Sequence, residues 1–80
     1  VLVTIDLPGV SREDLNLEVS ERAIRIEAKC ILRGQVIRYR KEIELPVEVD
    51  PEGAEASLRM GVLVVKIPIK GRRFRRVEVR

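Results

Sequence analysis

The feature that most constrains the fold is the stretch 54–68, which has the pattern of two strands meeting at Gly61. Before this glycine, small or apolar residues alternate with polar ones, at Ala54, Ala56, Leu58 and Met60. A period of two predicts a strand that is buried on one face. The run 62–67 is rich in β-branched residues, which predicts a second strand buried on both faces. Pro68 ends it, because proline cannot donate to a central ladder.

The rest of the chain predicts more strands of the half-buried kind. Apolar and polar residues alternate in four further segments, 1–7, 15–19, 24–28 and 36–45. Pro8-Gly9 ends the first segment, and Ser11 is placed to begin a single helical or 3₁₀ turn. No segment has apolar residues at helical spacing. The sequence therefore predicts an all-β fold, an antiparallel sandwich or barrel.

The length of the chain limits the size of its core. Eighty residues make one domain at most, and only two residues are aromatic, so the core must be aliphatic. A domain this small gains much stability from assembling into oligomers. The chain opens on a strand pattern without an initiator Met, and we expect it to be a fragment of a longer protein. It shows no transmembrane-length apolar stretch and no signal-peptide pattern, so no membrane partner is expected.

The residue types that carry most enzymatic and metal chemistry are scarce. There is no histidine, which removes the commonest general base and the commonest metal ligand. The single cysteine, Cys30, is interpreted as a small, partly buried filler in a cytoplasmic protein. No phosphate-binding loop or catalytic constellation is present. We therefore predict that the chain is not an enzyme and needs no cofactor or metal.

Charge divides the chain into a body and a tail. Residues 1–69 hold ten Lys/Arg and twelve Asp/Glu, whereas residues 70–80 hold six Lys/Arg and only Glu78. We expect a domain over 1–69 and a basic C-terminal extension over 70–80. Binding of nucleic acid through the extension is a hypothesis that rests on Arg72, Arg73, Arg75 and Arg76. A solvated linker is the favoured interpretation, because one aromatic residue makes a poor stacking platform.

Two apolar rows are candidates for a binding surface. One consists of Leu15, Leu17 and Val19, and the other of Ala56, Leu58 and Met60. If the two strands lie side by side or face each other at an edge, they form a groove for an extended peptide. The alternative is that both rows fill the core of the sandwich. The pattern by itself leaves both possibilities open.

Several motifs together resemble the small heat-shock protein family and its α-crystallin domain. They follow the family's order over residues 1–69 and are Asp6-Leu7-Pro8-Gly9-Val10, Glu13-Asp14-Leu15, Ile24-Arg25-Ile26-Glu27-Ala28, Leu45-Pro46 and Val49-Asp50-Pro51. The most specific is Ala56-Ser57-Leu58-Arg59-Met60-Gly61-Val62-Leu63, which resembles the A-x-x-x-x-G-V-L signature. Ile67-Pro68-Ile69 followed by Gly71 is similar to archaeal members.

The resemblance implies an immunoglobulin-like antiparallel β-sandwich of seven to eight strands. It also implies an ATP-independent chaperone, a holdase that binds unfolding clients and assembles from homodimers into larger homo-oligomers. In such proteins a C-terminal I/V-x-I/V motif docks into a groove, and here Val77 and Val79 match that motif. The two apolar rows would then be the walls of the groove. The runner-up is a co-chaperone or adapter of the CS-domain type, a family that lacks both the signature and the tail motif.

The sequence departs from the family pattern at three places. Met60 stands where Asn is usual, and Lys41 stands where a frequent Arg lies in the long strand. The segment 30–36 is too short for the swapped strand of non-animal members. We therefore favour a dimer in which the long strand 36–45 pairs edge to edge, with Ile37, Tyr39 and Lys41 at the interface. A reduced loop that still crosses to the partner is the alternative.

Overall fold

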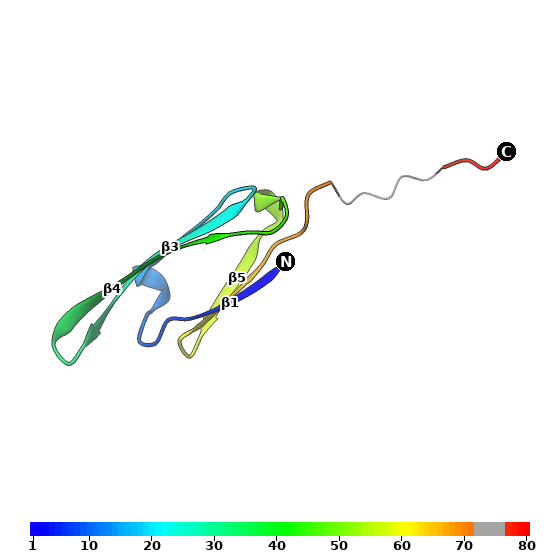
Figure 1. Ribbon diagram of the computed structural model, residues 1–80. Helices are drawn as coiled ribbons and strands as arrows, with labels where there is room; N and C mark the ends of the chain where they lie inside the picture. The colour runs from blue at the N-terminus through cyan, green and yellow to red at the C-terminus, as the bar shows by residue number, and fades with distance from the viewer. Residues whose placement is uncertain (72–76) are drawn as a thin grey trace.

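The chain forms two three-stranded antiparallel sheets that pack face to face (Figure 1). The computed structural model describes residues 1–71 and 77–80. One sheet has the order β1-β6-β5 and consists of β1 (Leu2–Asp6), β6 (Val62–Lys66) and β5 (Glu55–Arg59). The other has the order β2-β3-β4 and consists of β2 (Leu15–Val19), β3 (Ala23–Leu32) and β4 (Gln35–Glu44). Two 3₁₀ turns, η1 (Arg12–Asp14) and η2 (Pro51–Gly53), complete the described elements.

The predicted all-β sandwich is confirmed, but with fewer strands than the family resemblance implies. The described residues form six strands, not seven or eight. Residues 45–54 contribute η2 and a single bridge between Val49 and Ile69. Pro46 and Pro51 interrupt this segment, and proline has no N–H to donate to a ladder.

The core is aliphatic and is built from both sheets. Its least exposed large side chains, each below 2% exposure, are Ile24, Ile26, Val49, Leu63, Val65 and Ile67. Ile24 and Ile26 alternate along β3 with exposed Arg25, as the period of two predicts. Cys30 lies in the same core, with 5% of its surface exposed.

The 3₁₀ turn after Pro8-Gly9 forms where the sequence predicts it, with Ser11 in the N-cap position. The side chain of Ser11 does not cap the backbone. Its Oγ donates instead to Oδ2 of Asp14, at 3.2 Å. The turn leads directly into β2 and so places Arg12 beside that strand's apolar row.

A two-residue turn joins β5 to β6. Met60 and Gly61 have φ angles of 50° and 76°, the left-handed pair of a type I′ hairpin turn. Assigning Met60 to the buried row of the preceding strand was therefore wrong: β5 ends at Arg59, and the Met60 side chain is fully exposed. The alternating pattern in the sequence extends to Met60, but in the structure Met60 and Gly61 form the turn and lie outside the strand.

Replacing Gly61 with alanine is expected to destabilise the domain by about 1–3 kcal/mol, because left-handed backbone costs a Cβ-bearing residue roughly 1–2 kcal/mol. A Cβ at this position also lies 3.1 Å from the Cα of Pro8 and 3.4 Å from the carbonyl oxygen of Leu7. Equilibrium denaturation in urea measures the loss.

Gly34 is the matched control for this change. Its φ of 77° is nearly the same, but a Cβ there meets nothing within 4 Å. Gly34→Ala therefore carries only the dihedral cost, and the difference between the two variants measures the crowding against Pro8. Equal losses would contradict the crowding argument.

Candidate functional site

A groove lies between two strands that are each at an edge of their sheet, β2 and β5. It has a volume of about 330 Å³. Its lining consists of Arg12, Leu15, Leu17, Ala56, Ser57, Leu58, Arg59 and Leu63. Residues from both faces of β5 contribute to the lining, so the groove follows the open edge of that strand as well as one face. Four of the six residues expected in a groove, Leu15, Leu17, Ala56 and Leu58, are thus brought together.

The other two expected wall residues lie outside this lining. Val19 is half-buried at the end of β2, beyond the groove. Met60 lies in the exposed turn described above. The period-two pattern indicated which residues share a face, but not where along the two strands the edges come close enough to form a groove.

The sequence pattern did not indicate the floor of the groove or its two arginines. Leu63 is 1% exposed and forms the floor, since it belongs to the core as well as to the lining. Arg12 and Arg59 add two positive charges to an otherwise largely apolar lining. Arg12 comes from η1, whose position beside β5 no local pattern indicates. The groove suits an extended, partly apolar segment that carries a negative charge.

A second candidate surface is the edge of β4. This ten-residue strand pairs with β3 on one side only, and its other side is open within the described part of the chain. Of the three residues predicted at a dimer interface, Ile37 and Tyr39 are half-buried against the core and Lys41 is exposed. The hydroxyl of Tyr39 donates to the carbonyl of Pro8 at 3.5 Å. Desolvation, with a smaller contribution from Cys30, raises the pKa of Tyr39.

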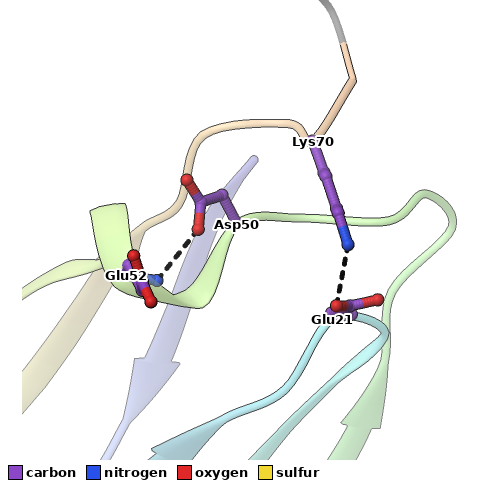
Figure 2. Close-up of polar contacts among 4 residues, drawn as sticks. All are labelled: Glu21, Asp50, Glu52 and Lys70. Carbon is purple, nitrogen blue, oxygen red and sulfur yellow. Dashed lines mark hydrogen bonds and ion pairs between the residues drawn. The ribbon is translucent and has the colours of Figure 1, made fainter.

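The start of the C-terminal segment contacts the rest of the domain as far as Lys70. The backbone amide of Lys70 donates to the carbonyl of Glu48 at 3.0 Å, beside the bridge between Val49 and Ile69. Its Nζ lies 2.8 Å from Oε1 of Glu21 in the β2–β3 connection (Figure 2). The hydrogen bond to Glu21, together with the negative charge of that carboxylate, raises the pKa of Lys70. Asp50 accepts from the amide of Glu52 and so caps η2 next to this point (Figure 2).

The tail motif is accessible. Val77 and Val79 are 76% and 92% exposed. The four arginines of the nucleic-acid hypothesis, Arg72, Arg73, Arg75 and Arg76, lie outside the described residues.

Two other features are absent from residues 1–71 and 77–80. No group of three or more His, Cys, Asp or Glu side chains there is arranged to hold a metal ion. No helix of this part of the chain has the length and apolar composition to cross a membrane.

Solved structures of small heat-shock proteins and α-crystallin domains share this fold. Heat shock protein 16.0 from Schizosaccharomyces pombe superposes with a TM-score of 0.78 at 18% identity, covering 99% of this chain and 84% of its own. A small heat-shock protein from Xylella fastidiosa gives 0.76 at 22% identity, covering 98% and 84%. The rat α-crystallin domain gives 0.74 at 19% identity, covering 98% and 88%.

Comparison by sequence leads to the same family. The small heat shock protein of Pisum sativum is 29% identical over an alignment 77 residues long, with a coverage of 85% of this chain. This chain spans only 33% of the length of that curated relative. The pea protein is chloroplastic, and a cytoplasmic location for this chain stays a prediction. The family model described as Hsp20/alpha crystallin family matches residues 1–80. The chain therefore belongs to the Hsp20/alpha crystallin family.

Proposed function

We propose that this chain is the core of an ATP-independent holdase, which binds unfolding proteins and prevents their aggregation. Membership of the Hsp20/alpha crystallin family supports a chaperone role. The observation that carries the finer proposal is the groove between β2 and β5, which combines half-buried leucines with the open edges of two strands. An unfolding client exposes extended apolar segments, and such a groove binds them through both side chains and main chain.

The same groove is proposed to receive the tail of another subunit. In an extended chain, Val77 and Val79 lie on the same face about 7 Å apart, the spacing that Leu15 and Leu17 have along β2. Burying both valines contributes roughly 3–6 kcal/mol before the linker is ordered. Glu78, which stands between them, complements the two arginines of the lining.

Docking with so small a free energy is reversible, so the groove can be vacated by a tail and then bind a client. Once the cost of association and of ordering the linker is deducted, little of the gross contribution is left for a single tail. An assembly held by several tails keeps each released tail at a high effective concentration near its groove. The oligomer therefore persists while individual tails exchange. Heating releases tails and opens grooves to clients. The small heat-shock protein from Xylella fastidiosa has a distinct high-order structure, which is consistent with assembly of this kind.

The smallest unit of that assembly is proposed to be a homodimer formed along β4. The strand is long, its edge is open, and hydrogen bonding to a second copy satisfies the donors and acceptors on that edge. The short connection from β3 to β4, a two-residue turn at Arg33 and Gly34, supports edge pairing over exchange of a loop strand.

The holdase activity is tested with the full-length protein and a heat-aggregating enzyme in the absence of ATP. Light scattering is expected to be suppressed at a stoichiometric ratio. Ala56→Lys, which adds bulk and charge to the groove, should reduce the suppression. Glu55→Lys adds the same residue one position away, outside the groove lining, and should leave it largely unchanged. Failure of the unmodified protein to suppress scattering would contradict the proposed function.

A further inference from the structure

The outward face of β4 carries a charge pattern that is complementary to itself. Pairing with β3 places the side chains opposite buried Ile24 and Ile26 on the inner face, and those of the intervening residues on the outer face. From one end of the strand to the other, the charged residues on this outer face are Arg38, Arg40, Glu42 and Glu44. Two positive charges are thus followed by two negative ones. An antiparallel copy of this strand presents the same series in reverse.

The charges nearest the ends of this series are poorly matched within one subunit. A guanidinium nitrogen of Arg40 lies 3.3 Å from Oε1 of Glu27 in β3, and the residue opposite Glu42 on β3 is Arg25. Arg38, in contrast, stands opposite Lys29, a like charge, and Glu44 stands opposite Ala23. Neither Arg38 nor Glu44 forms an ion pair with a described residue. Both would gain from an opposite charge on a neighbouring strand.

The backbone of β4 allows such a neighbour to pair with these residues. The two-residue turn at 33–34 makes Leu32 and Gln35 a hydrogen-bonded pair, and such pairs alternate along an antiparallel ladder. The N–H and C=O groups of the outward-facing residues therefore point to the open edge. They are the groups available to a second copy.

We propose that two copies pair along β4 in a single register, with Lys41 on the two-fold axis. This inference rests on the proposed homodimer and specifies its geometry. Arg40 then stands opposite Glu42 of the partner subunit, and Arg38 opposite Glu44 of the partner subunit. By symmetry the dimer contains four such opposite-charge pairs.

This register also matches the inner face and extends a charged row. Tyr39 stands opposite Ile43 of the partner subunit, an aromatic and β-branched pair of the kind that stabilises sheets. On the outer face, Glu27, Arg40, Glu42 of the partner subunit and Arg25 of the partner subunit make a row of alternating sign across the joined sheets. The one like-charge contact is between the two Lys41 side chains, which are exposed and long enough to diverge.

The neighbouring registers lose these matches. Moving the axis to Arg40 lengthens the ladder by one pair at each end, but sets Arg40 against itself and Tyr39 against Lys41 of the partner subunit. Moving the axis to Glu42 sets two carboxylates against each other. Each shift leaves two opposite-charge pairs in place of four, and like charges directly opposite are destabilising.

Disulfide trapping measures the register directly, in the full-length protein with Cys30→Ala. Cysteine is introduced singly by Arg40→Cys, Lys41→Cys or Glu42→Cys, and covalent dimer is followed under mild oxidation. In the proposed register the two residues 41 are about 4.5 Å apart at Cα, within disulfide range. We expect Lys41→Cys to cross-link at least about tenfold faster than the other two, whose own copies are separated beyond that range. Faster cross-linking at position 40 or 42 would overturn the register and leave the dimer standing.

Charge reversal provides a second readout that does not depend on cysteine. Arg38→Glu and Glu44→Arg are each expected to weaken the dimer about tenfold, and the double variant to recover most of that loss. Arg38→Glu also places a carboxylate opposite Lys29 of its own subunit, so the fold is not put at risk. Sedimentation measures the dissociation constant. Unchanged dimerisation in both single variants, with no cross-link at any of the three positions, would reject pairing along β4, whereas the light-scattering assay tests chaperone activity separately.

Discussion

Replacing Val77 and Val79 with glycine in the full-length protein is expected to break the proposed large assembly down to dimers. The two valines are the apolar side chains that the proposed groove receives, and their combined burial contributes roughly 3–6 kcal/mol per tail before ordering costs. Without them the contact retains only Glu78 and main-chain hydrogen bonds. In the proposed assembly each subunit contributes one tail, so the loss is repeated at every tail contact. Size-exclusion chromatography with light scattering measures the mass.

Glu78→Gly is the matched control for this variant. It introduces the same backbone freedom into the same segment but keeps both valines. Its assembly is expected to loosen only modestly, because one charge near Arg12 and Arg59 is lost while the apolar contact remains. An unchanged mass for the double valine variant would rule out tail docking. It would leave pairing along β4 unaffected, since that contact lies on a different strand.

Replacing Leu63 with alanine is expected to lower the free energy of unfolding by about 2–5 kcal/mol, the range for emptying a fully packed leucine site. The side chain is 1% exposed and belongs to the core cluster. For a small domain this loss is a large fraction of the total stability, which for folded proteins is about 5–15 kcal/mol. Chemical denaturation at a fixed protein concentration measures it, because self-association of the kind proposed also contributes to stability.

Leu32→Ala is the corresponding control, since it makes the same truncation at a side chain that is 54% exposed at the tip of the β3–β4 hairpin. Its effect is expected to stay within about 1 kcal/mol. Similar losses for the two variants would contradict the assignment of Leu63 to the core.

Leu63 also connects stability to the proposed function. It is at once a core residue and the floor of the groove between β2 and β5. A cavity at this position deepens the groove as it loosens the sandwich, so the variant is expected to bind clients differently even below its unfolding temperature. A groove built directly on the core has little freedom to change shape without a cost in stability.

The strands and the core were predictable because they follow from local chemistry. Alternation of apolar and polar residues located β2, β3 and β4, and the β-branched run around Val65 located the central strand β6. The 3₁₀ turn after Pro8-Gly9 was equally local. Where two local rules compete, alternation alone fails, as it did at Met60, where the geometry of a two-residue turn prevailed.

The groove was predictable only in part. Both apolar rows were visible in the sequence, but whether they filled the core or met at an edge depended on which strands are neighbours. In the structure β2 and β5 are edges of different sheets, and only Leu15, Leu17, Ala56 and Leu58 reach the common space. Arg12 and Arg59 join them through contacts between segments more than forty residues apart, which leave no periodic signal in the chain.

The stretch 54–68 shows most clearly which features follow from the sequence and which depend on the tertiary structure. The sequence by itself determined that two strands meet at Gly61 and that Leu63, Val65 and Ile67 face the core, because side-chain alternation and the freedom of glycine are properties of the local chain. Only the tertiary structure decided that the first strand is an edge and that Leu58 faces a groove. Those outcomes depend on how the two sheets pack, and packing brings together residues that are distant in sequence.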